Sequence, residues 1–157
     1  MTKRPRDLFG HPIRPPREDA IHAAIIELLC MAAHPRTLWW HCPNGAMMKP
    51  STRIYFARLG VLPGVADLCF VLPDKTSAFM EVKPPGGKLS PAQQHFQARC
   101  AVLGLRYRVV YSVTDAEEAL KGWNALRGAR GRDEACAQIG HQCNDANPLC
   151  GGRDVAA

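Results

Sequence analysis

The first strong pattern in the sequence is an apolar repeat near the start of the chain. Hydrophobic residues recur there at intervals of three and four, which is the spacing of one helix face. The positions are Ile21, Ala24, Ile25, Leu28, Leu29 and Ala32. The sequence therefore predicts a first helix from Glu18 to His34 with one side turned toward the core.

Two largely apolar runs in the middle of the chain are typical of paired strands. They cover residues 66–72 and 77–83, and the turn-forming sequence Pro73-Asp74-Lys75 separates them. Because so short a connection joins antiparallel neighbours, we expect a β-hairpin. A short aromatic strand over residues 38–41 should precede it, since Pro43-Asn44-Gly45 ends that run.

Capping residues predict a helix after the hairpin. Ser90, Pro91 and Gln93 offer a serine cap, a proline in the first turn and a capping-box partner. The helix should begin near Pro91 and stop at Gly104. Its buried face would consist of Ala92, Phe96, Cys100 and Leu103.

Similar signals define the remaining elements. Ser51 is expected to cap a second helix that Gly60 ends. Residues 106–113 alternate as a strand does, and Thr114 or Asp115 should cap a last helix. The apolar residues of that helix are Ala116, Leu120 and Trp123. This order of elements predicts an α/β fold with a central mixed sheet flanked by helices.

Composition narrows the class of protein. A chain of 157 residues that is 46% hydrophobic fits one domain with a real core. Lys and Arg outnumber Asp and Glu by 20 to 14, which favours a polyanionic partner. No apolar run approaches the ~20 residues of a membrane span, so we expect a cytoplasmic protein without membrane contact. Reduced thiols are expected, because Cys30, Cys69 and Cys100 lie inside apolar segments.

The composition at both ends of the chain differs from that of the middle, so we expect the folded domain to span residues 18–127. Residues 1–17 combine five basic residues with four prolines, which predicts a flexible basic arm. The arm is either a solubilising tail or a strap that contacts phosphates. Residues 128–157 lose all periodicity and are expected to be disordered. Their Cys136, His141, Cys143 and Cys150 could bind zinc, but the spacing lacks the usual short Cys-x-x-Cys unit.

Three polar residues interrupt the apolar hairpin. Asp67 lies near the start of its first strand, whereas Glu81 and Lys83 lie near the end of its second. Because side chains alternate, Glu81 and Lys83 share one face, opposite to Ala78, Met80 and Val82. An antiparallel hairpin brings the start of one strand beside the end of the other. We therefore expect the three side chains to meet.

This combination of residues is typical of phosphodiester hydrolysis. Two nearby carboxylates repel each other unless a cation lies between them, and oxygen ligands suit Mg²⁺ or Mn²⁺ rather than zinc. Such a cation activates water, while the ammonium of Lys83 can offset charge on the phosphate. The alternative is that Asp67 caps a turn and that Glu81 and Lys83 form a solvated ion pair on an edge strand.

Three ordered blocks of the sequence resemble one nuclease family. Gly64-Val65-Ala66-Asp67-Leu68, Phe79-Met80-Glu81-Val82-Lys83 and Gly87-Lys88-Leu89-Ser90-Pro91-Ala92-Gln93 are similar to successive signatures of the VRR-NUC family of PD-(D/E)XK nucleases. The resemblance covers residues 18–123 and includes the Pro43-Asn44-Gly45 turn. It implies a restriction-endonuclease-like fold, a divalent metal and cleavage of DNA.

The resemblance also implies roles for individual residues. Asp67 and Glu81 become metal ligands, together with the Val82 carbonyl and the Glu18 carboxylate. Lys83 becomes the catalytic lysine. Glu18 has a second explanation, because an acid in the first turn also stabilises a helix dipole.

Further positions carry weaker assignments. Gln93 matches a glutamine near the family's active site, although a capping box alone would explain it. Asn44 could lie near the scissile phosphate, although asparagine before glycine is first of all a turn residue. Lys88 and Arg53 are candidate phosphate contacts, and their alternative is simple solvation. The family often has glutamine where this chain has His22, so no role is carried over to His22.

The predicted function is a metal-dependent DNA endonuclease that uses Mg²⁺ or Mn²⁺. Minimal members of the resembled family are associated with branched DNA such as Holliday junctions and act as homodimers, so branched DNA and a homodimer are expected here. One alternative is a non-catalytic DNA-binding module on a nuclease fold. Another is a nuclease acting on RNA, since a metal site contacts the phosphodiester and not the sugar.

Overall fold

Four strands form one mixed sheet in the computed structural model, which describes residues 16–43 and 50–128. The strands are β1 (Leu38–His41), β2 (Leu68–Val71), β3 (Ser77–Val82) and β4 (Arg106–Val110), in that spatial order. β2 pairs antiparallel with both β1 and β3, and β4 pairs parallel with β3. The predicted hairpin and the mixed sheet are confirmed.

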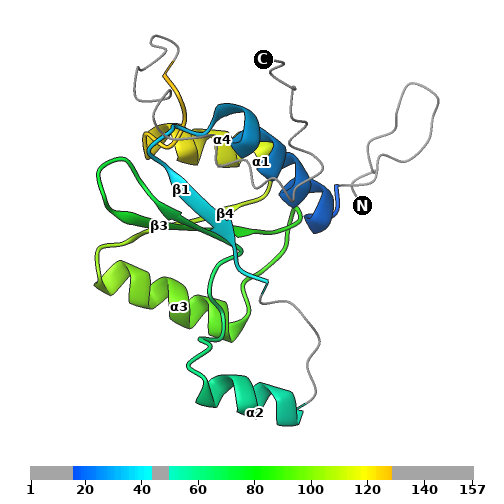
Figure 1. Ribbon diagram of the computed structural model, residues 1–157. Coiled ribbons are helices and arrows are strands. Elements are labelled where there is room, and N and C mark those ends of the chain that lie inside the picture. Colours follow the sequence, from blue (N-terminus) through cyan, green and yellow to red (C-terminus); the bar gives the residue numbers. More distant parts are fainter. Residues whose placement is uncertain (1–15, 44–49, 129–157) are drawn as a thin grey trace, which may run out of the picture.

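Helices cover both faces of the sheet. They are α1 (Glu18–Ala32), α2 (Pro50–Arg58), α3 (Pro91–Val102) and α4 (Val113–Gly122). α1 and α4 lie together on one face, α3 lies on the other, and α2 lies away from the sheet (Figure 1). This is the predicted α/β architecture, with a helical layer on each side of the sheet.

Alternation along β3 divides the interior into two parts. Ala78, Met80 and Val82 belong to the main core with α1 and α4. Phe79 points the other way and meets Phe96 of α3 edge to face, with ring centroids 5.1 Å apart. The α3 side therefore holds a smaller apolar cluster, and the next residue of β3 on that side is Glu81.

Several predicted boundaries were wrong by one or two residues. α1 ends at Ala32 rather than His34, whose backbone nitrogen donates to Ala125 O at 2.8 Å. α2 begins at Pro50, so Ser51 lies inside the helix instead of before it. β2 begins at Leu68 rather than residue 66, which leaves Asp67 just outside the strand.

The last helix begins earlier than predicted. Ser112 is its cap, and the Ser112 hydroxyl accepts a hydrogen bond from Asp115 N at 3.1 Å. The Asp115 carboxylate in turn accepts from Tyr111 N at 2.9 Å. Because this reciprocal capping ends the strand, β4 stops at Val110 rather than residue 113, and Thr114 lies inside the helix.

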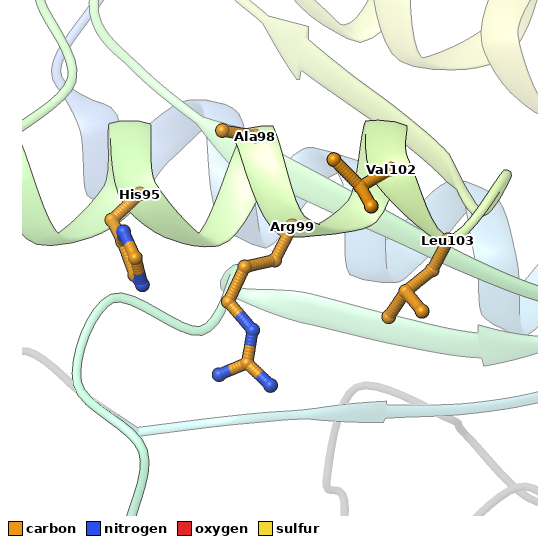
Figure 2. A pocket seen from close by; sticks show the side chains of 5 residues that line it. All are labelled: His95, Ala98, Arg99, Val102 and Leu103. Carbon is orange, nitrogen blue, oxygen red and sulfur yellow. The ribbon is translucent and has the colours of Figure 1, made fainter.

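The predicted buried face of α3 was correct only in its middle. Phe96 and Cys100 are buried, whereas Ala92 is exposed and Leu103 is 65% exposed. Leu103 is the C-cap residue and therefore lies beyond the last turn of the helix. It contributes instead to a shallow hollow of about 270 Å³ on the outer side of α3 (Figure 2), lined by His95, Ala98, Arg99, Val102 and Leu103.

The four cysteines of the described segments are free thiols, namely Cys30, Cys42, Cys69 and Cys100. Within the same segments, no helix combines the length and apolar character needed to cross a membrane. Residues 1–15 and 129–157, which hold most of the predicted arm and tail and all four candidate zinc ligands, lie outside the described residues.

Candidate active site

The pairing of β2 with β3 brings the predicted acids together. Leu68 pairs with Met80, so Asp67, one residue before β2, lies beside Glu81 at the end of β3. Asp67 Oδ2 accepts a hydrogen bond from Val82 N at 2.8 Å. The carboxylate of Asp67 is thus tied to the strand that carries Glu81.

Glu81 is completely buried, with 0% of its surface exposed. Its Oε1 accepts hydrogen bonds from Lys83 Nζ at 2.5 Å and from the side-chain amide of Gln93. Its Oε2 is buried and has no hydrogen-bond partner among the described residues. The alternative of a solvated Glu81–Lys83 pair was wrong, because α3 covers this side of the sheet.

Lys83 connects the sheet to α1. It is 8% exposed, and its Nζ also donates to Val82 O at 3.0 Å. Glu18, at the start of α1, places Oε1 3.7 Å from the same nitrogen. The structure therefore places the carboxylates of Glu18 and Glu81 against one ammonium group, and Asp67 lies beside Glu81.

Burial and charge shift the pKa values of this group. Burial raises the pKa of Glu81 to about 7, the hydrogen bond from Lys83 opposes that rise, and the charge of Asp67 adds to it. Burial would by itself lower the pKa of Lys83, but the bond to Glu81 raises it above its ordinary value. Lys83 is therefore a cationic hydrogen-bond donor at neutral pH rather than a base.

The metal-free protein is expected to lose stability between about pH 5 and about pH 8, because Glu81 must release a proton inside the fold. Its pKa near 7 lies above the ordinary 4.5, so the folded state binds this proton more tightly than the unfolded chain does. The stabilising contribution is complete below pH 4.5 and is lost as the pH rises through 7. Urea unfolding at both pH values measures it. Glu81→Gln should remove this part of the slope, and an unchanged slope would contradict the assignment.

Gln93 serves the helix cap and the acid site at once. Its Oε1 accepts from Ser90 N at 2.8 Å, and its backbone nitrogen donates to Ser90 Oγ at 3.3 Å, which completes the capping box. Its side-chain nitrogen donates to Glu81 Oε1. The two explanations weighed for Gln93 are therefore compatible, because one end of the amide caps α3 while the other end contacts Glu81.

Replacing Gln93 by glutamate separates these two tasks. A glutamate keeps the capping box but cannot donate to Glu81 and adds a negative charge beside it. We expect the hydrolytic activity of Gln93→Glu to fall at least about tenfold, a size common for groups that orient metal ligands, and repulsion from buried Glu81 to lower the stability of this variant as the pH rises. Gln93→Ala, which loses both bonds, should also lose about 1 kcal/mol of stability. Equal activity in wild type and Gln93→Glu would show that the amide has no role at the site.

The loop before Asp67 packs against the start of α3 through Gly64. This glycine has φ of +78°, and a Cβ placed on it would lie 2.3 Å from the carbonyl carbon of Ala92. Only a residue without a side chain allows this approach. Gly64 therefore sets the distance between the Asp67 loop and the helix turn that carries Gln93.

Two histidines that the sequence pattern did not assign also reach the site. His41, the last residue of β1, contacts Asp67 O through Nδ1 at 2.9 Å. His22 of α1 packs edge to face on His41, with ring centroids 4.6 Å apart. A sequence signal existed only for His22, as a departure from the family's usual glutamine.

The remaining candidate residues from the sequence differ in where they lie. Asn44 lies outside the described residues, and of Arg53 only its backbone position on α2 is described. Lys88 is exposed in the loop between β3 and α3. The Val82 carbonyl lies in the site, where it accepts from Lys83.

The donor set fits a hard divalent cation. It offers carboxylate oxygens with an excess of negative charge, and Glu81 Oε2 is a buried oxygen without a partner among the described residues. Such an oxygen is costly unless a cation or donor reaches it. In this structure the carboxylate oxygens are not arranged as a metal-binding group. Over residues 16–43 and 50–128, no three His, Cys, Asp or Glu side chains lie close enough together to hold a metal ion. The ammonium of Lys83 lies between Glu18 and Glu81.

Buried Glu81 beside half-buried Asp67 and a lysine, at the end of a hairpin in a mixed sheet, fits a nuclease-type α/β domain. The model of the VRR-NUC domain family matches residues 22–114, and the chain belongs to that family. A solved structure described as a VRR_NUC domain protein is similar over 70% of this chain and 89% of that one, with a TM-score of 0.56 and 16% sequence identity. No match was found among curated proteins.

Proposed function

We propose that this domain is a metal-dependent DNA endonuclease whose active centre consists of Asp67, Glu81 and Lys83. The observation that carries the proposal is the state of Glu81. This carboxylate is fully buried, one oxygen is held by Lys83 and Gln93, and the other has no partner among the described residues. A structural carboxylate would have both oxygens satisfied, whereas a cation ligand needs one oxygen left over.

Each residue of the proposed active centre has a separate role in hydrolysis. Asp67 and Glu81 would hold Mg²⁺ or Mn²⁺, with Glu18 and the Val82 carbonyl as further oxygen donors close by. The bound cation supplies Lewis acidity toward water and phosphate. Lys83 stays protonated and can donate to the attacking water or to a phosphate oxygen. Gln93 and Val82 N keep the two carboxylates in place.

The substrate we propose is branched DNA, cut by a homodimer. The net charge of +6 favours a polyanion, and exposed Lys88 lies in the loop that follows Lys83. Support for branched DNA and for a homodimer comes from the family resemblance, because two copies would place one active site on each of two strands.

A panel of labelled substrates tests this proposal. It contains a four-way junction, a flap, a duplex and a single strand in DNA, with RNA versions of the last two, each incubated with Mg²⁺ or Mn²⁺. We expect the junction to be cut fastest and light scattering to give twice the monomer mass. Faster cutting of RNA would move the proposal to an RNA nuclease, and binding without cutting of any substrate would make the domain a DNA-binding module.

A further inference from the structure

The backbone of Asp67 is held from outside its own strand. Asp67 precedes β2, and its carbonyl oxygen accepts two hydrogen bonds from the end of β1. The donors are Cys42 N at 2.8 Å and His41 Nδ1 at 2.9 Å. Because a carbonyl can only accept, the proton of a neutral His41 ring lies on Nδ1.

The ring of His41 is held in turn by α1. His22 packs against it edge to face, with an interplanar angle of 81°. His22 lies one helical turn after Glu18, so the face of α1 that brings Glu18 to Lys83 also supports the ring bound to Asp67. Burial lowers the pKa of His22, and the neighbouring His41 lowers it further, so the two rings meet without mutual charge repulsion at neutral pH.

Asp67 is therefore held through both its backbone and its side chain. Its carbonyl is bound to β1 through Cys42 and His41, and its carboxylate is bound to β3 through Val82 N at 2.8 Å. The backbone bond from Cys42 N continues the pairing of β1 with β2 by one position, and the His41 ring adds a side-chain bond to the same carbonyl. The second oxygen of the carboxylate, Oδ1, gains a defined direction from this double attachment.

We propose that His41 is a positioning residue, supported by His22, that fixes the backbone of Asp67 so that its carboxylate is preset for a divalent cation. The proposal rests on the proposed metal-dependent function. Bonds of this kind to a metal ligand commonly change metal affinity or activity by about tenfold to a hundredfold.

Four variants test the assignment by Mn²⁺ binding without DNA. Free Mn²⁺ is counted by its electron paramagnetic resonance signal during a titration of the protein. His41→Ala should weaken Mn²⁺ binding about tenfold or more. His41→Asn, whose amide can donate to the same carbonyl, should restore most of the affinity, and His22→Ala should weaken binding less than His41→Ala does. His95→Ala, on the outer side of α3 (Figure 2), serves as the control and should bind as wild type does.

A purely structural role would give a different result. It would lower the unfolding temperature of His41→Ala and His41→Asn together, without separating their Mn²⁺ affinities. Wild-type Mn²⁺ affinity in His41→Ala, or equal weakening in His41→Ala and His41→Asn, would overturn the inference.

Asp67→Ala, measured alongside, separates this inference from the proposed function. If Asp67→Ala loses Mn²⁺ binding while His41→Ala keeps it, only the role of His41 fails. If wild type binds no Mn²⁺, or Asp67→Ala binds it equally well, the proposed metal site fails and the inference fails with it.

Discussion

Replacing Lys83 by methionine is expected to slow DNA cleavage about a hundredfold to a thousandfold, as the loss of one preorganised donor does in other enzymes. Methionine fills a similar volume but removes the ammonium that contacts Glu81 and Val82. DNA binding should change little, because Lys83 is only 8% exposed. Single-turnover cleavage measures the rate, and fluorescence anisotropy with Ca²⁺ in place of Mg²⁺ measures the binding.

Lys121→Met is the matched control for this substitution. Lys121 is an exposed lysine of α4 whose Nζ lies 2.7 Å from Glu117, four residues earlier. Such surface pairs contribute little, so the control should cleave as wild type does. A Lys83→Met variant that stays folded and cleaves within a few-fold of the control would contradict the catalytic role of Lys83.

Gly64→Ala is expected to destabilise the fold by about 3 kcal/mol, from a left-handed backbone that alanine disfavours and from steric overlap with α3. The added Cβ would lie 2.3 Å from the carbonyl carbon of Ala92 and 2.7 Å from Gln93 N. Backbone atoms cannot move aside as a flexible side chain can, so the start of α3 must shift. Urea unfolding measures the loss.

Gly60→Ala separates the two causes. Gly60 has φ of +84°, but a Cβ placed there meets nothing within 4 Å. Gly60→Ala should therefore lose only the stability that depends on the backbone conformation, about 1–2 kcal/mol. Equal losses in the two variants would show that the contact between the Asp67 loop and α3 is unimportant.

The alternation of side chains along a strand was the feature of the sequence that predicted the site most reliably. The order acid, one residue, lysine at the end of β3 places Glu81 on the face opposite to Met80 and Val82. The turn over residues 73–75 then brings Asp67 beside Glu81. These relations depend only on strand geometry, which is why they follow from the sequence.

Features that depend on packing could not be predicted in this way. The complete burial of Glu81 follows from the placement of α3, which depends on the approach of Gly64 to Ala92. The contact of His41 with Asp67 follows from the register of β1 on β2. Leu103 has the right spacing for the core but lies beyond the last turn of α3. Spacing alone does not show where a helix ends against its neighbours.

The most direct test of the central claim compares wild type with Asp67→Asn in the cleavage of a labelled four-way DNA junction. Asparagine keeps the size of the side chain and an oxygen for Val82 N, and loses only the charge needed for a cation. The account predicts cutting by wild type with Mg²⁺ or Mn²⁺, none with a chelator, and none by Asp67→Asn although it still binds the junction. Cutting by Asp67→Asn at the wild-type rate, or by wild type in the presence of the chelator, would contradict it.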